Sequence, residues 1–343
     1  MELKTKLYLA IAHFLLVLPT TTWSMDIEEI DSDSIIPGKS EITGRVYNVV
    51  PSVGRPSYER VLSLATPHHA HLKLGDHTAL PDSIQFSDKI HYIHNQEQLG
   101  SCTGESLTQS MEMQLIESQY RPLSVLFVYW NERNVEGTVN EDSGASLSDG
   151  IEVVNKYGAC ADALWPYTNY KTTYTEKPTP ECYQDALKSV VLTYSHVPHT
   201  LDDLKGVLAQ KIPVVSGIVV KESFESESAT KTGIIPMPKR FEKTLGGHAI
   251  TLVGYDDAKQ LITFCNSWGA DWGDKGLGYL PYDYFSNPKL TMPTEIWSIN
   301  SVGPQTPPSS YGSWMSRLPS WSGFANLYHY YFPPKESSTD TPS

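Results

Sequence analysis

The sequence is poor in cysteine and in basic residues. It has four cysteines, and 26 lysines and arginines against 39 aspartates and glutamates in 343 residues, for a formal net charge of -13. Such an acidic chain is poorly suited to bind nucleic acid or an anionic membrane surface, so neither is expected as a partner. No phosphate-binding loop or dinucleotide fingerprint is present. The charge by itself indicates only a soluble surface.

Candidate metal ligands are also few. A histidine cluster precedes the main apolar part of the chain and comprises His68, His69, His71 and His77. These residues lack the cysteine partners and the helical spacing of zinc sites, and the pair His91 and His94 has the same weakness. We therefore expect no metal and no cofactor.

The first residues have the pattern of a secretory signal. Two lysines precede an apolar run from Leu7 to Leu18. The run is too short for a comfortable membrane span, and small residues at positions 22 and 24 indicate a cleavage site. Residues 1–24 are thus predicted to be a signal peptide and the protein to be secreted or periplasmic, with an uncleaved anchor as the alternative. No other stretch is apolar enough to span a membrane.

The rest of the chain divides into three parts that differ in composition and in hydrophobic periodicity. Residues 25–79 combine acidic stretches with prolines and histidines, which predicts an N-terminal extension or short prosegment. Residues 80–302 carry helical patterns first and strand patterns later, which predicts an α+β domain of two lobes. Residues 303–343 are rich in proline, serine and aromatic residues. They are predicted to form a C-terminal extension that docks on the body or contacts a partner, with a disordered end.

The individual elements follow from periodicity and turn signals. Helices are predicted over residues 102–118, 123–133, 147–158 and 200–210, and strands over 214–220, 249–255, 260–266, 278–282 and 296–300. The SLSD sequence at 146–149 resembles a capping box at the start of the third helix.

Three separated motifs supply a thiol, an imidazole and an amide. Cys102 lies in NQEQLGSCTG at 95–104, at the start of the first predicted helix; His248 lies in GGHA and Asn266 in CNSWG. A thiol nucleophile needs a base to become a thiolate, and the base needs a third group to hold its ring. A helix N-terminus also favours the thiolate. The order therefore predicts a Cys-His-Asn catalytic site.

These motifs resemble those of the papain-like cysteine peptidases over roughly residues 80–300. His248 follows Cys102 by 146 residues, within the ~130–150 typical of that family. NSWGADWG at 266–273 resembles a family segment, and LGSCT, DSGAS, LWPY and LGGH at 99–103, 142–146, 164–167 and 245–248 are similar to a bacterial-type branch. Thr103, where plant and animal members usually carry tryptophan, fits that branch. Gly247 does not indicate which side chains the substrate pocket accepts.

The resemblance implies a papain-like, two-lobed fold. A helical lobe with Cys102 would pack against a β-barrel-like lobe with His248 and Asn266, and Gln96 would donate to the oxyanion. The residues that the resemblance assigns to substrate binding or to the shielding of the site are Gly144, Ser146, Leu147, Gly247 and Trp268. An ordinary loop before a capped helix is the alternative for the segment around Ser146.

Two of the four cysteines could form a disulfide. Cys102 must stay free, and Cys265 lies in an apolar strand where a buried thiol is expected. Cys160 and Cys182 remain, and export would permit a disulfide between them. Sequence alone does not establish this pairing.

The predicted function is that of an exported cysteine endopeptidase acting on proteins or peptides. The alternatives are an acyl-transfer relative, such as a transglutaminase, deamidase or peptide ligase, and a non-catalytic binding protein. Residues 25–79 could inhibit in cis by lying along the cleft opposite to the substrate direction, and charging of the histidine cluster could weaken that contact in acid. A solvated spacer is the alternative.

Overall fold

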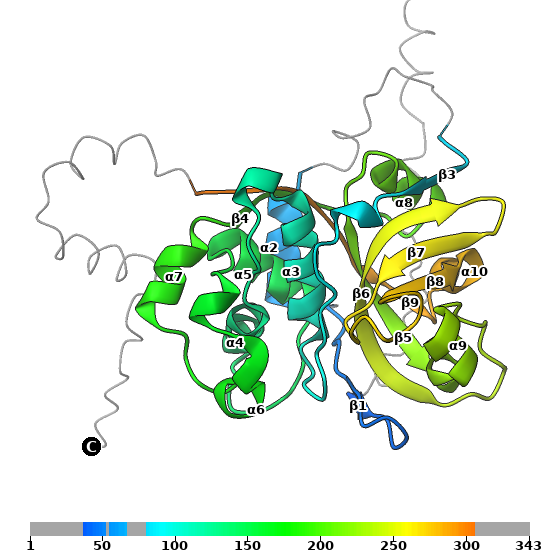
Figure 1. The fold of residues 1–343 in the computed structure, drawn as a ribbon, viewed down its shortest axis with the longest axis horizontal. Coiled ribbons are helices and arrows are strands. Elements are labelled where there is room, and N and C mark those ends of the chain that lie inside the picture. Colours follow the sequence, from blue (N-terminus) through cyan, green and yellow to red (C-terminus); the bar gives the residue numbers. More distant parts are fainter. Residues whose placement is uncertain (1–36, 53–54, 67–79, 306–343) are drawn as a thin grey trace, which may run out of the picture. The chain divides into compact units, whose positions relative to one another are not determined.

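The computed structural model describes residues 37–52, 55–66 and 80–305. Helices α3 to α7 form one lobe, and an antiparallel sheet with α8 to α10 forms the other (Figure 1). The predicted α+β, two-lobed fold is therefore confirmed. The signal peptide, the histidine cluster and residues 306–343 lie outside the described residues, so the predictions for them stay predictions.

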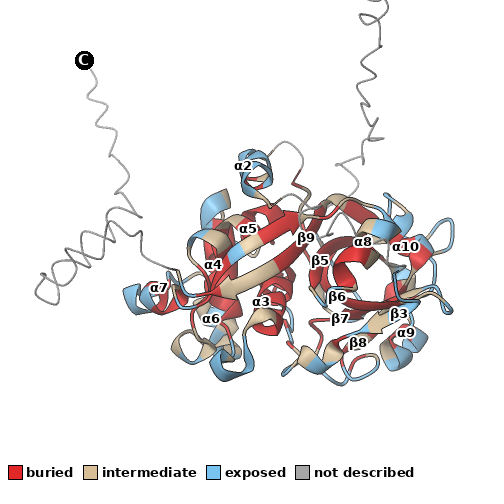
Figure 2. Cartoon of the chain, turned by 90° about the horizontal axis from the view of Figure 1, so that it is seen from above, coloured by how far each residue is buried: buried red, intermediate tan, exposed pale blue. Residues whose placement is uncertain are grey.

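The helical lobe is built around α3 (Cys102–Gln114). Helices α4 (Val125–Glu136), α5 (Leu147–Lys156), α6 (Tyr170–Thr173) and α7 (Pro180–Ala186) follow it. Residues 102–113 of α3 are all buried, as the red colour of this helix indicates (Figure 2). The helix ends four residues before the predicted end, because the backbone becomes extended at Leu115 and a 3₁₀ turn follows at Glu117–Gln119.

The strands of the sheet lobe pair with one another in antiparallel fashion. They are β3 (Ser83–Gln85), β4 (Val190–His196), β5 (Val214–Lys221), β6 (Thr244–Asp256), β7 (Leu261–Cys265), β8 (Leu277–Pro281) and β9 (Thr291–Gly303). Their order is β4-β9-β5-β6-β7-β8, and β3 pairs with β6. The five predicted strands correspond to β5 to β9. Strand β4 was not predicted, although its run of valine and threonine favours a strand.

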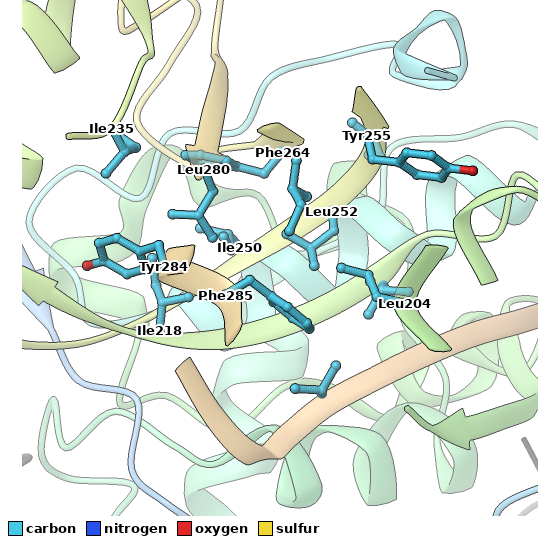
Figure 3. Packing of buried hydrophobic residues seen from close by; sticks show 14 of the residues in the cluster. Leu204, Ile218, Ile235, Ile250, Leu252, Tyr255, Phe264, Leu280, Tyr284 and Phe285 are labelled. Carbon is cyan, nitrogen blue, oxygen red and sulfur yellow. The ribbon is translucent and has the colours of Figure 1, made fainter. Parts of the chain in front are cut away.

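The main hydrophobic core lies within the sheet lobe. Leu252 from β6, Phe264 from β7 and Ile218 from β5 meet Leu204 from α8 (Leu201–Leu208) and Phe285 from α10 (Tyr282–Ser286) (Figure 3). All five side chains are fully buried. Burying side chains of this size stabilises the fold by about 1.5–3 kcal/mol each, so this core holds β6 and β7 in place.

The two lobes meet where β6 and β7 pack on α3. The hydroxyl of Thr251 on β6 donates to the carbonyl of Ser106 on α3 at 3.1 Å. The thiol of Cys265 at the end of β7 donates to the side-chain carbonyl of Gln109 at 3.6 Å. The N-terminal half of α3 therefore faces the two strands that carry, or lead into, His248 and Asn266.

The N-terminal extension is in contact with both lobes. Strands β1 (Gly38–Lys39) and β2 (Val46–Tyr47) form a hairpin, and α2 (Pro56–Leu64) follows. Before α2, one guanidinium nitrogen of Arg55 lies 2.7 Å from Glu136 and 2.8 Å from Asp149, two largely buried carboxylates of the helical lobe. Because buried carboxylates need a partner, residues 55–64 contribute to the packing of α4 and α5.

In the described part of the chain, no helix is long and apolar enough to cross a lipid bilayer.

Candidate active site

Cys102 is the first residue of α3 and is completely buried. Its position places the sulfur at the helix N-terminus, where free N–H groups favour a negative charge. The backbone N–H groups of Ala249 on β6 and of Asn48 in the extension also point at this sulfur. The residue that follows His248 is therefore in contact with the thiol.

His248 and Asn266 are joined as the sequence predicts. The Nε2 of His248 lies 2.9 Å from Oδ1 of Asn266, and both residues are buried. Within the described residues, the buried Nδ1 of His248 has no hydrogen-bond partner. Trp268 stacks on the imidazole with ring centroids 5.0 Å apart, so it covers the hydrogen bond between His248 and Asn266.

Gln96 is held rigidly beside this group. Its side-chain carbonyl accepts a hydrogen bond from the hydroxyl of Ser267 at 2.8 Å, and its backbone N–H donates to the carbonyl of the same residue. Its Nε2 donates to the carbonyl of Leu99 at 3.0 Å and to that of Val46, in the extension, at 3.4 Å. The amide that is expected to face an oxyanion is thus already directed at a peptide carbonyl.

Burial favours the neutral forms of Cys102 and His248. Burial raises the pKa of the Cys102 thiol to about 12. The backbone N–H groups of Ala249 and Asn48 lower this pKa, but their effect is smaller than that of burial. Burial likewise lowers the pKa of His248 to about 4, although the hydrogen bond to Asn266 favours the charged ring. The base and the helix N-terminus predicted from the sequence favour a thiolate, but the covered site favours the uncharged pair because solvent is excluded.

The extension lies between the two walls predicted to bind substrate. The N–H of Val49 donates to the carbonyl of Gly247 at 3.0 Å, and the N–H of Val50 donates to that of Ala145 at 3.1 Å. Both bridges are parallel. Gly144 has a φ of 71°, and a Cβ at this position would lie 1.8 Å from the carbonyl oxygen of Asn48. Only glycine fits so close to a bound backbone.

The remaining predicted pocket residues have structural partners. The hydroxyl of Ser146 caps α5 by accepting from the N–H of Asp149 at 3.1 Å, which supports the capped-loop interpretation for this residue. The N–H of Leu147 donates to the buried carboxylate of Glu295 at 2.8 Å. Sequence reasoning missed Asp142, which opens the DSGAS motif and accepts from the N–H of Gly100.

All four cysteines are free and buried, so the predicted disulfide is not formed in the structure. Cys160 and Cys182 are nevertheless neighbours: burial and the adjacent Cys182 thiol both raise the pKa of Cys160. The bridge therefore stays a prediction for oxidising conditions. In the residues that the structure describes, no group of three or more histidine, cysteine, aspartate or glutamate side chains is placed to hold a metal ion.

A buried triad of one histidine and two glutamates lies close to Gln96 in the sequence and on the helix of Cys102. The sequence pattern did not predict that these three residues meet. Nδ1 of His94 lies 2.8 Å from Glu105, and Nε2 lies 3.2 Å from Glu112. Both carboxylates belong to α3, and His94 precedes Gln96 by two residues. Desolvation disfavours the charged ring, but hydrogen bonds to the two carboxylates outweigh it and raise the pKa of His94 to about 10. The triad fastens the Gln96 segment to the helix of Cys102.

Comparisons with known proteins agree with this geometry. A profile described as papain family cysteine protease matches residues 80–283. An uncharacterized peptidase C1-like protein of Acanthamoeba polyphaga mimivirus is 36% identical over 219 residues, which cover 61% of this chain and 69% of the relative. Chymopapain of Carica papaya is 27% identical over 208 residues, which cover 58% of this chain and 54% of chymopapain.

A solved structure of a cysteine protease is also similar to this chain. Xylellain, a cysteine protease from Xylella fastidiosa, is 30% identical and superposes with a TM-score of 0.59, covering 78% of this chain and 95% of that structure. The chain belongs to the papain family of cysteine proteases, and the predicted resemblance to this family, bacterial members included, is confirmed. It is accordingly a hydrolase of the thiol protease class.

The triad generates a pH-dependent stability prediction. Removing the ring in His94→Gln leaves two buried carboxylates without their cation, which should lower the free energy of unfolding by about 3–5 kcal/mol. The folded-state pKa of His94 is raised from 6.5 to about 10. The stabilisation is thus complete below the unfolded value and is lost as the pH rises through the folded value. Thermal unfolding measured across that pH range should show that the difference in stability between wild type and His94→Gln becomes smaller as the pH rises.

The matched control is His91→Gln. His91 lies 3.6 Å from the largely exposed Glu117, and such a surface pair contributes at most about 1 kcal/mol. A gap between wild type and His94→Gln that is absent, or that widens with pH, would contradict the ionised triad.

Proposed function

We propose that this protein is an exported endopeptidase that hydrolyses peptide bonds with Cys102 as nucleophile and His248 as base and acid. The observation that carries the proposal is the combination of two contacts: His248 Nε2 lies 2.9 Å from Asn266 Oδ1, and the N–H of Ala249 points at the Cys102 sulfur. One strand therefore presents both the base and a contact to the nucleophile, and Asn266 fixes the ring orientation.

The reaction would follow from these positions. With substrate in place of the extension, His248 takes the thiol proton through Nδ1 and the thiolate attacks the peptide carbonyl. The developing oxyanion is stabilised by Nε2 of Gln96 and the backbone N–H of Cys102, each contributing about 2.7–4 kcal/mol in comparable sites. His248 then protonates the leaving amine, and it later activates the water that hydrolyses the thioester.

We also propose that residues 37–50 restrain the enzyme in cis. The peptide between Tyr47 and Asn48 turns its N–H toward the Cys102 sulfur, while its carbonyl oxygen lies against Gly246. The carbonyl at Gln96 belongs to Val46, a different peptide unit. Attack requires a carbonyl carbon at the sulfur with its own oxygen at the oxyanion donors. The extension is thus bound in an unproductive arrangement, which explains how it could cover Cys102 without being cut.

The rival functions make different predictions about products. An acyl-transfer relative would use the same three residues but would join the acyl group to an amine instead of water. A binding protein on this fold would form no covalent intermediate. Hydrolysis is favoured over the binding protein because the nucleophile, base, orienting amide and oxyanion donor are all present. The natural substrates are proteins or peptides as a class, in keeping with the family.

Export and a disulfide complete the proposal. We expect signal peptidase to cut after Ser24 and oxidation to join Cys160 to Cys182, whose side chains are neighbours. Mass spectrometry of the exported protein, digested without reduction, should find an N-terminus after residue 24 and a peptide pair linked through these two cysteines. Retention of the first 24 residues would contradict the signal peptide, and free Cys160 and Cys182 thiols would contradict the bridge.

Substitutions in the site should separate the roles. Cys102→Ala should remove peptide hydrolysis, and His248→Ala should lower kcat/KM by at least about 10²–10⁴-fold. Asn266→Ala should have a smaller effect because the amide only orients the ring. Gln96→Ala should lower kcat by about 10²–10³-fold.

The control for the thiol is the double change Cys160→Ala with Cys182→Ala, which removes both partners of the proposed bridge and leaves Cys102 in place. Circular dichroism should show that every variant is folded. Cleavage by Cys102→Ala near the wild-type rate would refute the assignment. Products that carry a new amide linkage instead of a new carboxyl terminus would favour acyl transfer.

A further inference from the structure

Glu225 lies next to the covered site but belongs to neither the nucleophile nor its partners. It is the last residue of the 3₁₀ turn Glu222–Glu225, between β5 and α9 (Glu227–Thr232). The preceding Phe224 is fully buried and packs edge-on against Trp268 with ring centroids 5.7 Å apart. This packing fixes the backbone of Glu225 beside the tryptophan that covers His248.

The carboxylate of Glu225 receives three hydroxyl groups. Ser40 Oγ donates at 2.6 Å to one oxygen, while Thr43 Oγ1 at 2.6 Å and the Tyr47 hydroxyl at 2.5 Å donate to the other. All three donors belong to the extension. Hydrogen bonds to a charged acceptor are stronger than those between neutral groups. The single carboxylate of Glu225 therefore binds the extension through three strong hydrogen bonds.

The hairpin presents these hydroxyls as one unit. Ser40 Oγ accepts from the backbone N–H groups of Ile42 at 3.2 Å and Thr43 at 3.1 Å, which closes the turn between β1 and β2. Gly44 completes the turn with a φ of 70°. Because the turn is organised by its own hydrogen bonds, little further ordering is needed to bring Ser40 and Thr43 to the carboxylate.

Tyr47 links this attachment to the catalytic group. Its ring meets those of His248 and Trp268 edge-on, each with centroids 6.0 Å apart, and the ring is fully buried. Burial, followed by the charge and hydrogen bond of Glu225, raises the pKa of Tyr47, so the phenol remains a donor. Next to it, the guanidinium of Arg45 lies 4.2 Å from the ring centroid of Trp268.

We propose that Glu225 is the docking site for the extension, and that the contacts of its carboxylate with Ser40, Thr43 and Tyr47 hold residues 38–50 over Cys102 and His248. The partner that this surface recognises is a hairpin segment of this chain with hydroxyls in this spacing. The proposal deepens the restraint put forward under the proposed function. Loosening the contact at Glu225 should expose the thiol more often.

The test measures access to Cys102 in the full-length chain with iodoacetamide as the probe. Glu225→Ala should increase the rate of Cys102 alkylation about tenfold or more, because it removes an acceptor shared by three hydrogen bonds. Tyr47→Phe, which deletes one hydroxyl, should give a smaller increase. Combining the two should add little to Glu225→Ala, since both changes act on one contact. Peptide mapping assigns the label to Cys102 among the four thiols.

The matched control is Glu227→Ala, which removes a carboxylate that pairs, among the described residues, with the exposed Lys231 at 2.5 Å. It should label at the wild-type rate. Equal rates for wild type and Glu225→Ala would overturn the docking site. If Glu225→Ala does not fold, the double change Ser40→Ala with Thr43→Ala removes donors from the extension and should accelerate labelling in its place; an unchanged rate there would equally overturn the proposal.

Peptide hydrolysis measured on the same samples separates this inference from the proposed function. Faster labelling without any hydrolysis would support the docking site and contradict the peptidase. Hydrolysis that depends on Cys102, together with unchanged labelling in Glu225→Ala, would support the peptidase and contradict the docking site.

Discussion

The packing of β6 on α3 is the contact on which the active site depends. It brings the N–H of Ala249 to the sulfur of Cys102, while the Thr251 hydroxyl holds the carbonyl of Ser106 one turn further along the helix. The core of the sheet lobe fixes β6, and the complete burial of α3 from 102 to 113 fixes the helix. Cys102 from one lobe and His248 from the other can therefore be kept in register without a covalent link.

Exclusion of water from this interface has two opposite consequences. In the covered site it favours the neutral thiol and the neutral imidazole, since neither charge has solvent to stabilise it. In the proposed mechanism a substrate would replace the extension, and the same dry surroundings would strengthen the hydrogen bonds from Gln96 and from the backbone N–H of Cys102 to a developing charge. The extension fills the space between Gly144 and Gly247, and burial in the covered site keeps Cys102 and His248 uncharged.

The sequence predicted those features that depend on local patterns or on fixed spacing. Cys102, His248, Asn266 and Gln96 stand in short motifs, and the predicted hydrogen bond between His248 and Asn266 is present. Four core helices and five strands followed from periodicity and caps. A path of the extension along the cleft was only one of two alternatives from the sequence, because that path is fixed by backbone hydrogen bonds such as that from Val49 to Gly247, which leave no side-chain pattern. His94 was considered only as a weak metal ligand, because its two carboxylates lie on a separate helix.

The central claim is that Cys102 forms a covalent acyl intermediate during peptide-bond hydrolysis. The most direct measurement is to mix the full-length chain with an N-blocked amino acid p-nitrophenyl ester, stop the reaction with acid and map the peptides by mass spectrometry. The account predicts a thioester on the peptide that contains Cys102 and no turnover by Cys102→Ala. Ester turnover that is unchanged in Cys102→Ala, or an acyl group on another residue, would contradict it.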